Sequence, residues 1–159
     1  MDSCLQKLKK DYEKLREKYR LPSFNELNVD FEIEKLQETE TDFLLRSIRR
    51  AMIEKTAVIL RFLEILVNPT EAHSQMYIFS ILKSISPEMK KTIDKVYKEM
   101  TVIELGSLSL DIDYDEKNEV KFILEMSKKW PSIKKDLKDI TQKIGVVWTH
   151  EKNHDDYFG

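Results

Sequence analysis

Residues 42–67, DFLLRSIRRAMIEKTAVILRFLEILV, decide the predicted fold. The stretch contains neither proline nor glycine, so one helix of about 39 Å can run through it without a break. Apolar residues occupy nearly every side of this helix. One set of positions recurs at steps of four and three along a narrow ridge: Arg50, Glu54, the small Ala57, Arg61, Glu64 and Asn68. A helix that is polar on a single ridge is typical of one that other helices surround, so we expect a long central helix over residues 42–67.

Four prolines divide the rest of the chain into further helices. Each stands beside a residue that could cap a helix, in the pairs Pro22–Ser23, Pro69–Thr70, Ser86–Pro87 and Pro131–Ser132. Proline is tolerated at helix starts, because a backbone N–H there would have no partner within the helix. The side-chain oxygen of Ser or Thr can accept a hydrogen bond from a backbone N–H of the first turn. We therefore expect an all-α single-domain bundle of five to seven helices, in which Trp130 ends one helix and Pro131 opens the last.

The segment after Gly106 is ambiguous in its secondary structure. Apolar and polar residues alternate from Leu108 to Tyr114, which is typical of a strand, yet Leu105, Leu108 and Ile112 also fit one face of a helix. A lone strand would leave its backbone hydrogen bonds unmade, and the chain has no second strand candidate. We therefore favour a helix that continues past Gly106.

Composition and charge limit the class of protein. We expect residues 1–149 to form one helical domain and residues 150–159 a frayed, polar C-terminal tail. The net charge is −2, so no strong overall field favours nucleic acid or a membrane surface. The longest apolar run, residues 57–67, is too short and too charged to span a bilayer. With a single cysteine and no apolar leader segment, the sequence predicts a cytoplasmic protein.

An irregular and acidic segment precedes the central helix and contains three large apolar residues: Phe24, Leu27 and Phe31. We expect a short helix over residues 23–28, followed by chain laid across the surface. Large side chains displayed on such a segment can anchor a protein partner. Phe24, Leu27 and Phe31 are therefore candidate interaction anchors.

Lys55 is a candidate buried functional lysine. Its helical neighbours are all apolar: Ile48, Ala51, Met52, Val58, Ile59 and Phe62. A lysine on a buried face must be deprotonated, paired or extended to water. One interpretation is an amine tuned for nucleophilic or anion-binding chemistry. The favoured alternative is a packed stem whose ammonium meets a carboxylate from the acidic residues 26–42.

Basic residues gather in residues 7–20 and in two further blocks, and together these three blocks could bind phosphates. Of the two further blocks, the first is on the central helix and the second follows it much later in the chain: Arg46, Arg49 and Arg50, then Lys128, Lys129, Lys134 and Lys135. If they converge, they form a surface that tracks a nucleic-acid backbone. They could equally pair with the acidic segment or keep the bundle soluble.

Two motifs resemble metal sites and fail as such. His150, Glu151 and His154 match the H-E-x-x-H pattern of zinc proteases, but a catalytic zinc needs a third ligand and only five residues follow. Residues 111–122 open like a calcium loop, but Glu116 stands where glycine is needed and Phe122 where a bidentate glutamate is needed. We therefore expect no metal and no cofactor, and the sequence identifies no catalytic residue and no small-molecule substrate.

Three segments carry a resemblance: LPSFNELNVDFEI at residues 21–33, DFLLRSIRR at residues 42–50 and WPSIKKDL at residues 130–137. Together they resemble small helical archaeal proteins of unassigned function. The resemblance implies a cytoplasmic helical protein and carries over no catalytic residue. We expect a non-catalytic interaction or structural module, such as an adaptor or assembly subunit, with a protein partner or a second copy. The alternative is a nucleic-acid-associated protein that binds phosphates through basic helix faces.

Overall fold

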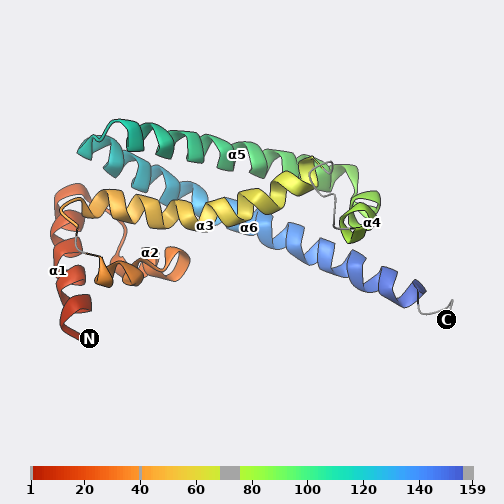
Figure 1. The fold of residues 1–159 in the computed structure, drawn as a ribbon, viewed down its shortest axis with the longest axis horizontal. Helices are drawn as coiled ribbons and strands as arrows, with labels where there is room; N and C mark the ends of the chain where they lie inside the picture. Colours follow the sequence, from red (N-terminus) through yellow and green to blue (C-terminus); the bar gives the residue numbers. More distant parts are fainter. Residues whose placement is uncertain (1, 40, 69–75, 156–159) are drawn as a thin grey trace. The chain divides into compact units, whose positions relative to one another are not determined.

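The computed structural model describes the backbone of residues 2–39, 41–68 and 76–155, and side chains within residues 4–39, 41–68 and 78–146. These residues contain no strand, which confirms the all-α prediction (Figure 1). Six α-helices and one 3-10 helix follow one another: α1 (Asp2–Tyr19), α2 (Phe24–Phe31), η1 (Ile33–Glu38), α3 (Leu44–Val67), α4 (Met76–Ser84), α5 (Pro87–Ile112) and α6 (Glu116–Asp155).

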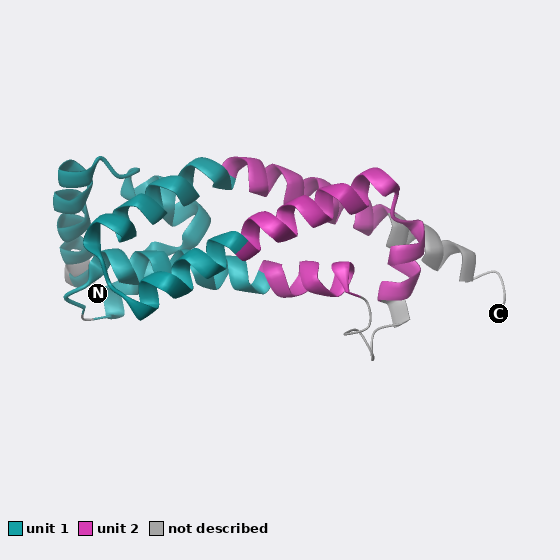
Figure 2. Cartoon of the chain, turned by 90° about the horizontal axis from the view of Figure 1, so that it is seen from above, with its two compact units in different colours: residues 1–58, 102–130 teal, residues 59–101, 131–159 magenta. Residues whose placement is uncertain are grey.

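The chain folds into two compact units (Figure 2). Unit 1 comprises Met1–Val58 and Val102–Trp130, and unit 2 comprises Ile59–Thr101 and Pro131–Gly159. Helices α3, α5 and α6 each contribute residues to both units. The two units are described separately below.

In unit 1, a capping box starts α2 and fixes the residues that follow it. The Ser23 hydroxyl accepts from the Glu26 N–H at 3.2 Å, while the Ser23 N–H donates to the Glu26 carboxylate at 2.6 Å. Helix α2 extends to Phe31, further than the predicted residues 23–28, because Leu27 and Phe31 are both buried. The ring of Phe31 packs against Trp130 with 5.0 Å between centroids. In the segment that was expected to lie across the surface, Phe31 and Ile33 are buried in unit 1 and most of the other residues up to Thr39 are exposed.

Helix α5 continues past Gly106 to Ile112, as predicted. Its inward side buries Ile103, Ser107 and Leu110, so the helix spacing prevails over the strand-like alternation. Gly106 lies in this helix without a positive φ angle.

The predicted break at Pro131 is wrong, because α6 runs continuously from Glu116 to Asp155 with Pro131 inside it. Proline already has a helical φ angle, and its main cost in a helix is one lost hydrogen bond and a clash with the preceding turn. Buried side chains on both sides of Pro131, among them Met126, Trp130 and Ile133, hold the helix in place. The backbone of α6 also continues into the segment that was predicted to be a polar tail.

Helix α3 buries Ile48 and Met52 in unit 1 and Leu63 in unit 2. Its predicted polar ridge is exposed at Arg50, Glu54, Arg61, Glu64 and Asn68. The exposed side is wider than this ridge, because Val58 and Phe62 also reach the surface.

Candidate functional site

One of the arginines that were predicted to bind phosphate, Arg49, is buried within unit 1. Arg49 is fully buried and donates to both carboxylate oxygens of Glu119, at 2.7 and 3.3 Å. Its Nη2, which makes the longer of these bonds, also donates to Asp111 at 2.7 Å, and its Nη1 donates to the Ser107 carbonyl at 3.1 Å and to the Ser107 hydroxyl. Helices α3, α5 and α6 therefore meet at one guanidinium, whose donors all have acceptors.

The two neighbouring arginines are held in the same cluster. Arg50 forms an ion pair with Asp111 at 2.9 Å. The Arg46 guanidinium lies over the ring of Tyr114 at 4.6 Å, and its Nε lies 3.9 Å from the carboxylate of Glu119. Full burial rules out Arg49 as a phosphate-binding residue, so that part of the prediction is wrong. Arg50 is 57% exposed and Arg46 is 24% exposed, and phosphate binding by these two stays a prediction.

The electrostatics of this cluster favour its charged form. Hydrogen bonds from Arg49 lower the pKa of Asp111, with a further contribution from Arg50, although partial burial opposes the shift. Burial by itself would lower the pKa of Arg49, but its bonds to Asp111 and Glu119 outweigh burial and raise it. The network is therefore an ion-pair cluster that joins three helices.

The lysines of the second block remain on the surface. Lys128 and Lys129 belong to unit 1 and are exposed, whereas Lys134 and Lys135 belong to unit 2. In unit 2 a shallow surface pocket of about 650 Å³ is lined by Lys134, Lys135 and Lys138 among others. Two acids that also line this pocket are already paired, Asp136 with Lys95 at 2.9 Å and Asp139 with Lys143 at 3.0 Å.

The three candidate anchors are not available to a partner. Phe24, Leu27 and Phe31 are all buried in unit 1. Phe24 packs edge-on against the ring of Tyr12, with 5.7 Å between centroids. Their role as exposed anchors is therefore corrected to a role in the core.

The predicted burial of Lys55 is also wrong. Its side chain is 44% exposed, and its ammonium lies 3.7 Å from the carboxylate of Glu32, which is itself exposed. Glu32 has a left-handed backbone, with φ of 54°, where α2 ends and η1 begins. The alternative interpretation, a lysine paired with a carboxylate from residues 26–42, agrees with this geometry.

An apolar face on α5 was not anticipated as a contact surface. Val102, Leu105, Leu108 and Ile112, here called the α5 outward face, are between 56% and 80% exposed. They lie opposite the side of α5 that packs into unit 1. The signal in the sequence is an α5 that is apolar on two opposite sides after residue 101.

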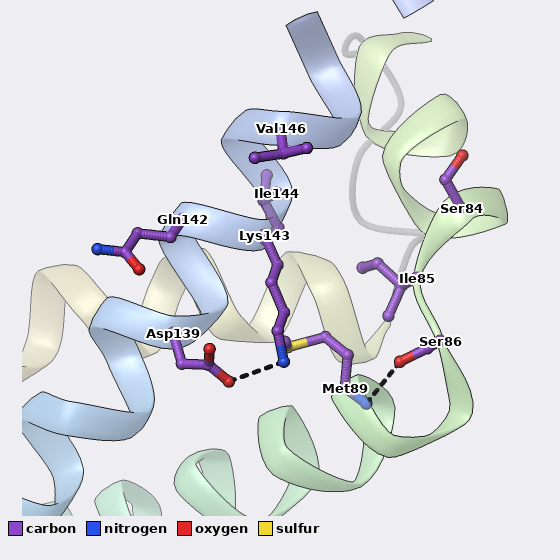
Figure 3. Close-up of a pocket in the computed structure, with 9 residues that line it drawn as sticks. All are labelled: Ser84, Ile85, Ser86, Met89, Asp139, Gln142, Lys143, Ile144 and Val146. Carbon is purple, nitrogen blue, oxygen red and sulfur yellow. Dashed lines mark hydrogen bonds and ion pairs between the residues drawn. The ribbon is translucent and has the colours of Figure 1, made fainter. Parts of the chain in front are cut away.

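Unit 2 contains an apolar pocket of about 490 Å³ (Figure 3). One wall is formed where α4 gives way to α5, by Ile85, Met89 and the serines beside them, and the other wall is formed by α6. The Ser86 hydroxyl accepts from the Met89 N–H at 3.2 Å and so caps α5. The α6 residues are Asp139, Gln142, Lys143, Ile144 and Val146.

Comparison of the chain with protein-family models, with curated proteins and with solved structures found no match. Within the described residues, no helix is both long and apolar enough to cross a lipid bilayer. The same part of the chain contains no group of three or more His, Cys, Asp or Glu side chains that could hold a metal ion. The side chains of His150, Glu151 and His154 lie outside the described residues.

Proposed function

We propose that the protein is a non-catalytic assembly subunit that associates with a second copy of itself through the α5 outward face. The observation that carries the proposal is the exposure of Val102, Leu105, Leu108 and Ile112 along one stripe of a single helix. Contiguous apolar surface of this kind is uncommon on monomeric proteins and usually marks a contact.

The spacing of the α5 outward face suits packing against another helix. Val102, Leu105 and Ile112, with Ser109 between the last two, follow the alternating steps of three and four that one helix offers to another. The opposite side of α5 is anchored by Ile103, Ser107 and Leu110, so the face is already ordered before a partner binds. Association therefore involves little loss of backbone entropy.

A second copy is the partner that this face fits most simply. Its four large side chains are all uncharged, so two copies can oppose them about a two-fold axis without burying an unpaired charge. Burial of each such side chain contributes about 1.5–3 kcal/mol when complete. The phosphate-binding alternative loses the fully buried Arg49, while Arg46 and Arg50 already lie beside acids of unit 1.

The test is the mass of the full chain in solution, measured by sedimentation velocity from low micromolar to submillimolar concentration. We expect a monomer–dimer equilibrium that Leu105→Glu weakens by at least about tenfold, since a charge would be buried in the contact. The matched control is Val29→Glu, which places the same charge on a solitary exposed valine of α2 in the same unit. A chain that stays monomeric throughout, or equal effects of the two variants, would refute the proposal.

A further inference from the structure

We propose that the apolar pocket of unit 2 binds a single-chain amphiphile with an anionic head group, of the fatty-acid class. The proposal rests on the shape and lining of the pocket and on the charges around it. It concerns a different unit from the α5 outward face and does not depend on the proposed assembly.

The interior of the pocket suits a short hydrocarbon chain. Ile85 and Met89 are buried and form the floor on one side, while Ile144 and Val146 line the other. A volume of about 490 Å³ lies within the range of small-molecule sites, which are mostly apolar with a few polar groups at fixed places. Figure 3 shows Lys143 joined to Asp139 by their ion pair, and Gln142 pointing away from Ile85 and Met89.

Lys143 provides the group that would meet an anionic head. Its ammonium pairs with Asp139 one helical turn away at 3.0 Å, and both side chains are about half exposed. Pairs of this kind on a helix surface contribute only about 0.3–0.5 kcal/mol, so Lys143 can turn to a ligand at little cost. The pocket thus has a cation at its edge that is weakly committed within the protein.

A second feature beside the pocket favours an anion over a cation. The N-terminus of α5, which begins at Pro87 beside the pocket, adds the positive end of a helix dipole.

The probe is sodium decanoate below its micelle concentration, with decyltrimethylammonium as a ligand of equal chain length and opposite charge. Isothermal titration of the full chain should show saturable binding of one decanoate, and binding of the cation at least about tenfold weaker. Shortening the chain to octanoate should weaken binding by about fourfold for each methylene removed, because each buried methylene contributes a fixed free energy.

Two variants test the two parts of the pocket. Val146→Glu places a carboxylate in the apolar lining and should weaken decanoate binding by at least about tenfold; Val146 is 55% exposed, so folding tolerates the change. Lys143→Met should weaken binding by about threefold or more. Lys138→Met is its matched control, since it removes the same charge from α6 at a position that does not line this pocket.

Four results would overturn the proposal: no saturable binding of decanoate, equal affinity for the cationic amphiphile, no effect of Val146→Glu, or equal losses in Lys143→Met and Lys138→Met. The last would show a general charge effect rather than a site. Leu105→Glu in the α5 outward face should leave decanoate binding unchanged, so the failure of either proposal is distinguishable from failure of the other.

Discussion

Units 1 and 2 place their charged residues differently. In unit 1, a fully buried arginine joins three helices through Glu119, Asp111 and Ser107. In unit 2, the ion pairs Lys95–Asp136 and Lys143–Asp139 lie between partly or fully exposed side chains. Removing one partner of a buried ion pair strongly lowers the free energy of unfolding, because the other charge is left unpaired in the interior. A surface pair contributes little to that free energy, so its lysine can bind a ligand instead. Among the described residues, unit 1 thus has one buried charged cluster beside its surface pairs, whereas the pairs Lys95–Asp136 and Lys143–Asp139 of unit 2 have both side chains at least partly exposed.

The largest expected effect breaks the buried pair. Glu119→Gln should lower the free energy of unfolding by about 3–5 kcal/mol, because Arg49 would keep its charge in the interior with its main partner neutralised. Asp136→Asn, the matched change in unit 2, should cost less than about 1 kcal/mol. Urea unfolding followed by circular dichroism measures both.

A double variant separates the charge from the packing at this position. Arg49→Met with Glu119→Leu removes both charges and keeps apolar volume, so it should recover most of the stability that Glu119→Gln loses. If Glu119→Gln and Asp136→Asn cost the same, the contrast between the two units is false.

Acid should weaken unit 1 through Asp111. Its pKa is lowered in the native state by Arg49 and Arg50, so its contribution is present above the unfolded pKa of about 3.9 and is lost as the pH falls through the lower native pKa. We therefore expect the free energy of unfolding to fall as the pH drops below about 4. Asp111→Asn should reduce the slope of this free energy against pH by less than the slope that the uptake of one proton gives, since Asp111 is 34% exposed and its ion pairs are partly screened by water.

The measurement is urea unfolding at a series of acidic pH values, with Asp136→Asn as the control. Asp11, Glu26 and Glu116 of unit 1 also have lowered pKa values, each mainly through a hydrogen bond from Lys14, Ser23 and Tyr19 respectively. Part of the pH dependence should therefore survive in Asp111→Asn. An unchanged slope in that variant would contradict its place in the network.

Much of the fold was predictable because helix periodicity is a local property. The long helix α3, its exposed ridge and the continuation of α5 all follow from spacing within one segment. The continuity of α6 through Pro131 was not predictable in this way, because burial of Trp130 and Ile133 by distant parts of the chain prevails over the local preference.

The site was harder to predict because its partners are distant in sequence. Arg49 forms hydrogen bonds with residues 58 to 70 positions away in the sequence. A count of the charges near Arg49 in the sequence therefore does not reveal the acids that compensate its charge. One signal existed: Glu119 falls in register with the buried Ile123, Met126 and Trp130 at steps of four, three and four. A single acid within an apolar stripe indicates a buried partner of opposite charge.

The smallest expected effect is at Lys55, a charge of unit 1 that should behave like those of unit 2. Lys55→Met should change the free energy of unfolding by less than about 0.5 kcal/mol, because its pair with Glu32 is exposed at both ends. Lys35→Met is the matched control, since Lys35 pairs with the exposed Glu54 in the same unit. Urea unfolding at two salt concentrations should show small and similar effects for both. A loss of several kcal/mol in Lys55→Met alone would mean that Glu32 depends on this lysine to stay charged, and exposure would then no longer separate the two kinds of ion pair.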